Sequence, residues 1–430
     1  MEKKPLELSK DFQFALELLE KEGRNLFITG RAGTGKSTLL SLLRNTTRKK
    51  SVVLAPTGVA ALNVQGQTIH SFFGFPPRMF PRSEIKRRRD KKLFKNLELL
   101  IIDEISMVRA DLLDHIDYFL RLNRENPMPF GGLQVVFFGD LFQLPPVIAS
   151  QEESAIYESQ YPTPYFFSAD VFKANFSMEM YELKKVYRQA DRHFLRLLEG
   201  IRLNQADDED LEDLNQRYLP AFEAEAYYIT LTARNATADQ INLRKLEQIS
   251  EREKRYPAAV KGEFNPSLFP TDQVLRLKPQ AQVMLLKNDP ERRFVNGTIG
   301  KIIQLGEESI QVLIHEGHEK EKVIELERAD WEVLRYKTNL ENPFLIETET
   351  IGSFNQFPVK LAWAITIHKS QGKTFDKVVV DLGKGAFEHG QTYVALSRCR
   401  SLEGLVLKQP LRQSDIITDE RVVSFYQRNF

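Results

Sequence analysis

Short apolar runs alternate with longer amphipathic stretches along the first half of the chain. Runs rich in Val, Ile, Leu and Phe occupy residues 26–29, 52–55, 97–102 and 135–138. Apolar strands separated by helical stretches are typical of a parallel sheet that is covered by helices. The pattern predicts a first α/β domain over residues 1–180, with a small insertion at about 64–95.

The second half repeats this pattern and interrupts it once. Further strand-like runs at 228–231, 361–366, 378–381 and 405–407 predict a second α/β domain, made of residues 181–273 and 351–430. Between them, residues 274–350 change to short alternating strands with turn signals such as Asn296-Gly297. This spacing predicts a small all-β barrel inserted in the second domain.

Composition limits the class of protein. At about 150 residues per domain, 430 residues allow about three domains, and 42% hydrophobic residues supply a core for each. Cys399 is the single cysteine, which excludes an internal disulfide framework and a cysteine-built zinc site. Residues 1–10 do not resemble a secretory signal, and no apolar run is long enough to span a membrane. We therefore expect a soluble, cytoplasmic protein.

Charge is balanced overall but segregated locally. Sixty Lys and Arg residues face 59 Asp and Glu residues, for a formal net charge of +1. Residues 78–95 nevertheless hold nine basic and two acidic residues, and residues 207–213 hold six acids. The basic run at 86–92 has three interpretations: a surface that grips duplex DNA, a nuclear-import signal, or a solvated face.

A phosphate-binding loop follows the first predicted strand. Residues 30–38 read Gly-Arg-Ala-Gly-Thr-Gly-Lys-Ser-Thr, and leucines at helical spacing come next. Glycines in such a loop let backbone N–H groups surround a β-phosphate, the lysine meets the β- and γ-phosphate oxygens, and the hydroxyl of the next residue binds Mg²⁺. The pattern predicts an ATP and Mg²⁺ site that includes Gly33, Thr34, Gly35, Lys36, Ser37 and Thr38.

An acidic pair supplies the second half of a nucleotide site. Asp103 and Glu104 follow the four apolar residues 99–102. We expect Asp103 to hold Mg²⁺ together with Ser37, and Glu104 to orient and deprotonate the attacking water. The two segments together predict hydrolysis of a nucleoside triphosphate.

Three further segments resemble a known family. They are residues 103–108 (Asp-Glu-Ile-Ser-Met-Val), 129–134 (Pro-Phe-Gly-Gly-Leu-Gln) and 139–147 (Gly-Asp-Leu-Phe-Gln-Leu-Pro-Pro-Val). They resemble superfamily-one helicases, most of all the Pif-type (petite integration frequency) DNA helicases, and the likeness runs from Leu8 to Leu407. It implies two RecA-like domains with an SH3-like barrel insertion. It also implies ATP-driven movement 5′ to 3′ on single-stranded DNA, with unwinding of duplex, fork or G-quadruplex DNA.

The resemblance also assigns roles around the nucleotide. Gln143 would sense the γ-phosphate, and Gln13 would read the adenine. Arg188, in Val-Tyr-Arg-Gln, and Arg398, in Tyr-Val-Ala-Leu-Ser-Arg, would reach from the second domain as arginine fingers. The segment 367–374 resembles the fifth helicase motif, in which Gln371 and Gly372 would approach the phosphates.

Other residues are candidates for contact with DNA. The loop at Thr57 and Gly58 offers a hydroxyl and free amides to a backbone phosphate, and residues 68–75 add hydroxyl, imidazole and aromatic groups. The turn Phe75-Pro76-Pro77 is a candidate wedge, whereas Phe73 fits a hydrophobic cluster better. By resemblance and these patterns, the expected DNA contacts are Thr57, Gly58, Thr68, His70, Phe72, Phe75, Lys287, Asn296, His368, Lys369 and Ser370.

Alternatives stay open from the sequence alone. The nearest is a RecD-type helicase, although the Phe130-Gly131-Gly132 segment speaks against it. A kinase or nucleotide switch with a phosphate-binding loop would lack the second domain that carries Arg398. A DNA-binding protein with a decayed ATPase would not need an intact Lys36 and Glu104. We expect a monomer when DNA is absent, and the sequence does not identify protein partners.

Overall fold

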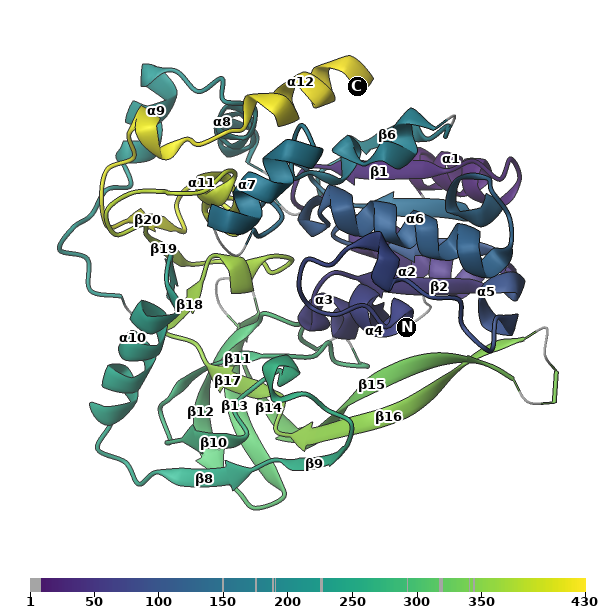
Figure 1. The fold of residues 1–430 in the computed structure, drawn as a ribbon. Coiled ribbons are helices and arrows are strands. Elements are labelled where there is room, and N and C mark those ends of the chain that lie inside the picture. The colour runs from purple at the N-terminus through teal and green to yellow at the C-terminus, as the bar shows by residue number, and fades with distance from the viewer. Residues whose placement is uncertain are drawn as a thin grey trace.

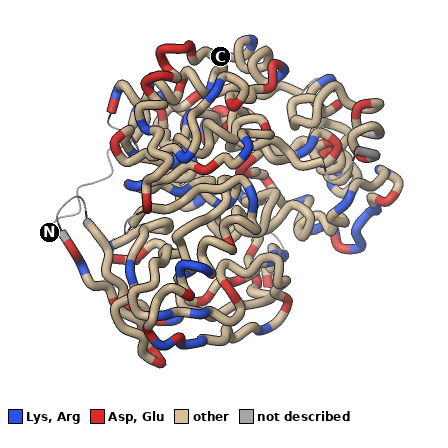
Figure 2. The backbone as a smooth tube through the Cα atoms, turned by 90° about the vertical axis from the view of Figure 1, so that its left-hand side faces the viewer, with Lys and Arg blue, Asp and Glu red and all other residues tan. Residues whose placement is uncertain are grey.

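A computed structural model gives the arrangement of the chain. It describes residues 9–148, 151–174, 176–187, 189, 191–224, 227–291, 293–316, 320–339, 341–342 and 345–430. Two α/β domains lie side by side, and a β-rich module with a long hairpin lies below them (Figure 1). Acidic and basic residues are spread over all three parts (Figure 2).

The first domain is built on a six-stranded parallel sheet in the order β3-β2-β4-β5-β1-β6. Its central strands are wholly buried because helices cover them on both faces. The strands are β1 (Leu26–Gly30), β2 (Ser51–Ala55), β3 (Gln67–Thr68), β4 (Leu99–Ile102), β5 (Gln134–Phe138) and β6 (Glu179–Leu183). The sheet therefore extends past the predicted boundary at residue 180, which falls inside β6.

The helices of this domain present apolar stripes to the sheet. In α1, Phe12, Ala15, Leu18 and Leu19 are buried on one face, and the Ser9 hydroxyl caps the start by accepting from the Phe12 N–H at 3.3 Å. The helices are α1 (Lys10–Glu20), α2 (Lys36–Thr46), α3 (Gly58–Asn63), α4 (Ile69–Phe73), α5 (Lys92–Asn96), α6 (Ala110–Arg124) and α7 (Gln151–Gln160). Short 3-10 turns are η1 (Arg82–Glu84), η2 (Ile105–Met107), η3 (Pro129–Gly132), η4 (Phe166–Ser168) and η5 (Asp170–Lys173).

The second domain has a four-stranded parallel sheet in the order β18-β7-β19-β20. Its strands are β7 (Ile229–Thr232), β18 (Ala364–Thr366), β19 (Val378–Asp381) and β20 (Leu405–Leu407). Its helices are α8 (Arg192–Leu203), α9 (Asp208–Asn215), α10 (Asn235–Glu247), α11 (Gln391–Leu396) and α12 (Glu420–Asn429), with turns η7 (His368–Ser370) and η8 (Gln413–Asp415). Two parallel α/β domains confirm the predicted fold class.

The β-rich module, which we call the barrel module, extends from β8 to β17. Five antiparallel strands in the order β14-β13-β12-β11-β17 enclose a separate apolar core. The module begins earlier and ends later than the predicted 274–350, because β8 pairs with β10 and β17 pairs with β11. Its elements are β8 (Lys254–Pro257), β9 (Ala259–Gly262), η6 (Pro266–Leu268), β10 (Val274–Leu277), β11 (Gln282–Leu285), β12 (Ile299–Leu305), β13 (Ser309–Glu316), β14 (Lys320–Glu327), β15 (Ala329–Thr338), β16 (Ile346–Gln356) and β17 (Val359–Leu361).

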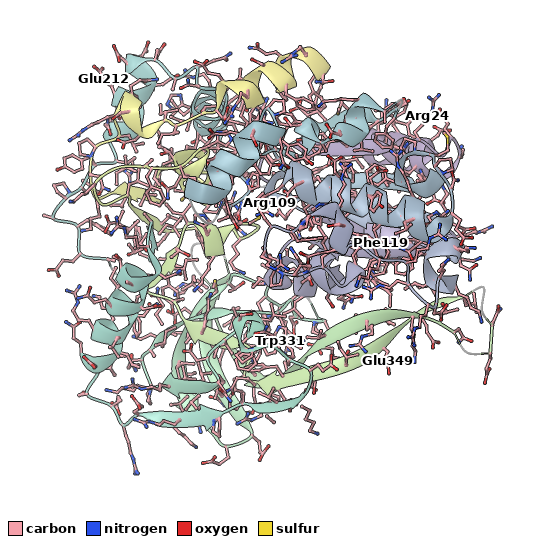
Figure 3. The ribbon with its side chains drawn as sticks, viewed as in Figure 1. Arg24, Arg109, Phe119, Glu212, Trp331 and Glu349 are labelled. Atoms are coloured by element: carbon pink, nitrogen blue, oxygen red, sulfur yellow. The ribbon has the colours of Figure 1, made fainter. Side chains whose placement is uncertain are left out.

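The pair β15–β16 forms a long hairpin that runs beside the first domain. Trp331 lies near the base of this hairpin and Glu349 further along it (Figure 3). Near the middle, the Tyr336 hydroxyl accepts a hydrogen bond from the Val53 N–H of β2 at 3.1 Å. The Tyr336 N–H donates to the Gln67 side-chain oxygen at 3.2 Å. The hairpin thus packs against the edge of the first sheet beside the two-residue strand β3.

Candidate nucleotide site and DNA-facing surface

The phosphate-binding loop lies between β1 and α2, as the sequence predicts. Gly33 and Gly35 have φ angles of 84° and 88°, a region that glycine enters without a steric penalty. The Lys36 ammonium donates to the carbonyls of Gly30 and Arg31 at 2.5 and 3.1 Å. Ser37 and Thr38 are exposed at the start of α2, while Thr34 is buried and its hydroxyl donates to the Arg31 carbonyl. The hydroxyls of Ser37 and Thr38 are therefore accessible at the start of α2, next to the loop.

Asp103 and Glu104 follow β4 next to this loop. Burial, and then the Glu104 carboxylate, raise the pKa of Asp103 to about 7. Burial raises the pKa of Glu104, while Lys36 and Arg398 oppose that rise, so the four groups share one electrostatic environment. Glu104 has a φ of 50°, which is uncommon for a residue other than glycine and is typical of functional sites.

The residues present fit a magnesium ion that arrives with a nucleotide. No group of three His, Cys, Asp or Glu side chains in the described ranges is arranged to hold a metal alone. A Mg²⁺ ion bound to ATP needs one or two protein ligands, because phosphate oxygens and water complete its shell. Ser37 and Asp103 are such ligands, and a cation beside Asp103 would lower the pKa of that carboxyl.

Gln143 lies in a tight turn after β5, close to the second domain. Its side-chain amide donates to Asp140 Oδ2 at 3.2 Å, and its side chain is buried. Gly390, which precedes α11 with a φ of 70°, approaches the same turn from the second domain. A Cβ atom at that position would lie 2.4 Å from the Phe142 carbonyl oxygen, so only glycine allows this approach.

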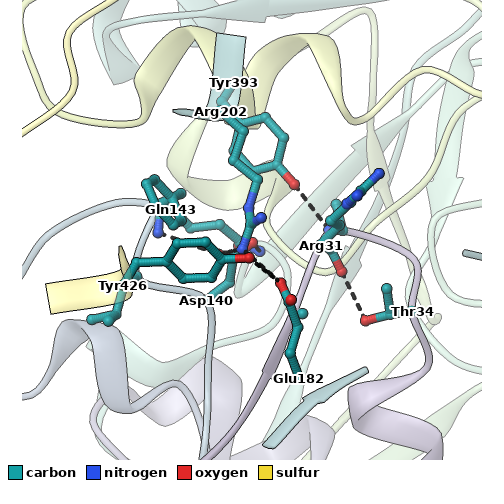
Figure 4. Close-up of polar contacts among 12 residues, drawn as sticks. Arg31, Thr34, Asp140, Gln143, Glu182, Arg202, Tyr393 and Tyr426 are labelled. Carbon is teal, nitrogen blue, oxygen red and sulfur yellow. Dashed lines mark hydrogen bonds and ion pairs between the residues drawn. The ribbon is translucent and has the colours of Figure 1, made fainter. Parts of the chain in front are cut away.

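The second domain also contacts the phosphate-binding loop directly. The Ala32 N–H donates to the Tyr393 hydroxyl at 3.0 Å (Figure 4). Arg31 forms an ion pair with Glu199 of α8 at 2.9 Å, and the Tyr187 N–H donates to the Gly33 carbonyl at 2.9 Å. The loop therefore lies at the interface between the two α/β domains.

Arg398 is buried at the end of α11 and bonds within its own domain. Its guanidinium donates to the Val394 carbonyl at 2.9 Å, the Ser397 hydroxyl at 2.8 Å and the Lys373 carbonyl at 3.3 Å. Arg188, the other predicted arginine finger, lies outside the described residues. The neighbouring Gln189 donates to the carbonyls of Ser397 and Cys399 at 3.2 and 3.1 Å, which links this segment to the end of α11.

The remaining predicted nucleotide residues flank this centre. Gln13 is exposed on α1, whose Phe12 ring would lie 2.9 Å from a Cβ atom on Gly35. Gln371 follows η7, and its side-chain nitrogen is buried without a hydrogen-bond partner in the described part of the chain. Gly372 follows it with a φ of 73°. The structure gives no contact between these two residues and the phosphate-binding loop.

The sequence matches known helicase families and proteins. The model described as PIF1-like helicase matches residues 9–211, and that of the DNA helicase Pif1 2B domain matches residues 264–305. The ATP-dependent DNA helicase Pif1 of Bdellovibrio bacteriovorus is 33% identical over 434 residues, which cover 98% of this chain and 92% of that protein. The chain belongs to the PIF1-like helicase family.

Other members differ from this chain in length or arrangement. Human ATP-dependent DNA helicase PIF1 is 35% identical over 94% of this chain, which spans 61% of the human protein's length. The Bacteroides sp Pif1 structure in complex with ADP-AlF4 gives a TM-score of 0.90 at 39% identity, covering 98% of this chain and 96% of that one. Bacteroides Pif1 bound to ssDNA has the same identity and coverages but a TM-score of 0.69. Within the described residues, no helix is both long and apolar enough to cross a membrane.

The barrel module covers part of the predicted DNA path. Thr57 caps α3, its hydroxyl accepting from the Ala60 N–H at 3.2 Å. A Cβ atom on Gly58 would lie 2.0 Å from the Leu268 side chain of the module. Leu268 of the barrel module therefore lies directly over Gly58 in this structure.

The aromatic residues after β3 are buried, and they include Phe72 and Phe75, two of the expected DNA contacts. Phe72 packs edge-on against Phe94 and Tyr336, with centroids 5.6 and 5.9 Å apart. Phe75 stacks on Phe73 at 5.3 Å. The rings form one apolar cluster because they follow each other in and around the short helix α4, and the cluster also accounts for Phe73 as expected.

The neighbouring polar residues have mixed environments. The Thr68 hydroxyl caps α4 by accepting from the Ser71 N–H at 3.2 Å. His70 is half-buried, and burial, followed by the nearby Arg109, lowers its pKa. In the candidate wedge, Pro77 is exposed and Pro76 is half-buried, with Phe75 anchored beneath them.

The predicted contacts of the barrel module and the second domain form a second group. The Lys373 ammonium donates to the Asn296 side chain at 2.9 Å, and His368 lies 3.1 Å from Glu388. Lys369 is exposed, whereas Ser370 is fully buried, its hydroxyl donating to the Ile367 carbonyl at 2.6 Å. The Ser370 hydroxyl is thus used within its own turn in this structure, and its contact with DNA stays a prediction.

Lys287, also predicted to contact DNA, is held inside the barrel module. Its ammonium donates to the Asp330 carbonyl and lies 4.9 Å from the Trp331 ring centroid. Burial lowers the pKa of Lys287, and the acids Asp330 and Glu332 act against this.

Sequence reasoning missed several residues of the site. Tyr393 lies in the segment that carries Arg398, and Lys373 lies in the segment 367–374, so both could have been found from the helicase motifs. Lys360 of β17 lies close enough to Lys369 and Lys373 for their charges to lower its pKa, but only the fold reveals this cluster. Glu199 and Tyr336 have no motif that distinguishes them from surface residues.

Proposed function

We propose that the chain is an ATP-dependent DNA helicase that moves 5′ to 3′ on single-stranded DNA and unwinds duplex, forked or G-quadruplex DNA. The observation that carries this proposal is the position of the phosphate-binding loop between two α/β domains. Three residues that follow the last strand of the first sheet contact this loop: Tyr187, Glu199 and Tyr393. A nucleotide at such an interface changes the relation of the domains when it is hydrolysed, which is what a translocating motor requires. A kinase or a nucleotide switch does not need this second domain.

The proposed chemistry assigns each group one task. Lys36 neutralises the β- and γ-phosphates, Ser37 and Asp103 hold Mg²⁺, and Glu104 takes the proton of the attacking water. Gln143 reports the γ-phosphate, while Arg398 and Arg188 neutralise the charge that develops on it. Because Arg398 bonds to backbone and hydroxyl groups of its own domain, it must change partners when a triphosphate enters.

The proposed DNA path crosses both domains beneath the barrel module. It includes Thr57 and His70 on one side and His368, Lys369 and Asn296 on the other, with the exposed Pro77 at the wedge. The Bacteroides relative has been solved bound to ssDNA, and another structure is described as two coordinating Pif1 helicases at forked dsDNA. These two structures support single strands and junctions as substrates. We propose a cytoplasmic protein of bacterial or phage type, with a nuclear location less favoured, that is a monomer when DNA is absent.

Strand separation tests the proposal. Three duplexes are compared at the same ATP and Mg²⁺ concentrations: one with a 5′ single-stranded tail, one with a 3′ tail and one blunt. We expect only the 5′-tailed duplex to be unwound, with ATP hydrolysis stimulated by single-stranded DNA. Preference for the 3′ tail would overturn the polarity, and ATP hydrolysis that ignores DNA would favour a kinase or switch.

A substitution pair then ties the activity to the loop. Lys36→Ala should lower ATP turnover by about 10²–10³-fold, since it removes a charged donor aimed at the transferred phosphate. Lys21→Ala is the matched control, because Lys21 is exposed at the end of α1 and pairs only with Glu17 in the described contacts. Equal activity of both variants would show that the hydrolysis comes from another source.

A further inference from the structure

A buried arginine joins the two α/β domains away from the nucleotide. Arg202 lies in the last turn of α8, and its side chain is 0% exposed. Its guanidinium lies 3.5 Å from Asp140 and 3.6 Å from Glu182, both carried by the first domain (Figure 4). A third carboxylate, Glu199, lies 3.4 Å away on α8 itself. A charge in such a place is stable only while its carboxylate partners stay where they are.

Two aromatic rings fix the plane of this guanidinium. The Phe142 and Tyr426 ring centroids lie 4.5 and 5.2 Å from the guanidinium carbon. Tyr426 belongs to α12, and its hydroxyl donates to Glu182 at 2.8 Å. Helix α12 therefore closes the cluster from outside, and it crosses from the second domain to the first as it does so (Figure 1).

The cluster touches the nucleotide site at two points without reaching the nucleotide. Asp140, which pairs with Arg202, accepts from the Gln143 side-chain amide on its other oxygen at 3.2 Å. Glu199, which also pairs with Arg202, forms the 2.9 Å ion pair with Arg31 of the phosphate-binding loop. Arg202 can therefore influence both the proposed γ-phosphate sensor and the loop through a single intervening carboxylate.

From this geometry we propose that Arg202 is a positioning residue that holds Gln143 in register with the γ-phosphate by fixing Asp140. The inference rests on the proposed ATPase function and adds a residue outside the motifs that carry it. When the domains separate, Arg202 leaves Asp140, and the Gln143 amide loses its fixed partner. Sensing of the γ-phosphate is thus available only while α8 and the first domain are in contact.

The test is a double-mutant cycle between Arg202 and Gln143. Arg202→Met keeps the length of the side chain and removes its charge. We expect it to lower kcat for ATP, at saturating single-stranded DNA, by about 10- to 100-fold, because a misplaced reacting-site group has an effect of that size. In a Gln143→Ala background the same substitution should lower kcat by at most about twofold. Arg196→Met is the matched control, since Arg196 lies on the same helix, is 55% exposed and pairs with Asp210.

Additive effects of the two substitutions would overturn the proposal, because a purely structural arginine lowers activity whatever stands at position 143. Loss of the Arg202 charge leaves Asp140 buried without its cation, so folding is checked by circular dichroism. Should that variant not fold, Arg202→Lys and Tyr426→Phe are measured in the same cycle, with non-additivity again expected. A wild-type protein without DNA-stimulated ATP hydrolysis would contradict the proposed function itself, whereas an active wild type with an additive cycle contradicts only the role of Arg202.

Discussion

Substitution of Tyr336 by Phe should make the protein bind single-stranded DNA more tightly. Strand β3 pairs only with Leu54 and Ala55 of β2, so it does not reach Val53. The Val53 N–H instead donates to the Tyr336 hydroxyl on the hairpin of the barrel module, and we call this arrangement docked. The same docked arrangement places Leu268 over Gly58 on the proposed DNA path. Docking of the hairpin and binding of DNA are therefore expected to compete.

The size of the effect follows from the hydrogen bond. Tyr336→Phe leaves the Val53 N–H buried and unpaired in the docked arrangement, which costs about 1–3 kcal/mol. In the undocked arrangement water satisfies that N–H, so the whole cost falls on docking. If the hairpin is docked on the first domain in most molecules, only the undocked fraction can bind DNA. The apparent Kd then equals the intrinsic Kd divided by that fraction. We expect the apparent Kd for single-stranded DNA to fall by roughly 5-fold and by no more than about 150-fold.

Fluorescence anisotropy with a labelled oligothymidine, without nucleotide, measures this change. Tyr256→Phe is the control, because the Tyr256 hydroxyl donates to the Gly306 carbonyl at 2.8 Å within the barrel module. It removes the same atom from a similarly buried ring without touching the first domain. An unchanged or higher Kd for Tyr336→Phe would refute the idea that docking competes with DNA, and an equal gain in both variants would assign the effect to loosening of the module.

Three further results are expected. Burial lowers the pKa of Lys360 to about 7, with Lys373 and Lys369 acting in the same direction, and burial lowers the pKa of Lys373 to about 8. If these two lysines lie beside the proposed path at Lys369 and Asn296, a DNA phosphate raises both pKa values, so binding takes up protons and the affinity should fall as the pH rises through 7 and 8; a flat profile would show that neither lysine meets DNA. Cys399 is buried and its pKa is raised to about 12, so iodoacetamide should label it only when denaturant unfolds the second domain, as mass spectrometry would show. Replacing the exposed Lys86, Arg87, Arg89 and Lys92 of the 86–92 run by Ala should reduce the slope of log K against log salt for forked DNA by about 0.9 per lost phosphate contact, with ATP hydrolysis unchanged; an unchanged slope would contradict the interpretation of this run as a duplex-gripping surface.

Much of the fold could be predicted because its strands have a local pattern. The runs at 378–381 and 405–407 are strands with the predicted ends, and the phosphate-binding loop lies between a strand and a helix as expected. The hairpin β15–β16 was missed because charged residues interrupt both of its strands. One of its faces packs on another domain, and the alternation of polar and apolar residues along a strand does not reveal such a contact. Strand β6 was missed for a similar reason, since it is only partly buried at the sheet edge.

The candidate site could be predicted where a motif specifies both residue type and local structure. That holds for the places of Lys36 and Asp103 in the fold, and it does not extend to the side chains that oppose the loop from the second domain. It does not extend to the environment of Phe72 either, because a run of phenylalanines fits a buried cluster as well as a stacking surface, and only the structure shows that Phe72 packs against Tyr336.

The missed residues share one physical feature, which is that they act between domains. Tyr393 and Glu199 contact the phosphate-binding loop, Gly390 allows the second domain to approach Gln143, and Tyr336 pairs with the edge of the first sheet. Each contact is worth little alone and is lost when the domains separate, so these contacts are where small free-energy changes shift a large-scale equilibrium. A helicase needs such an equilibrium to be close to balanced. The residues that balance it are therefore expected at domain interfaces, and substitutions there should change coupling and DNA affinity before they change the chemistry of hydrolysis.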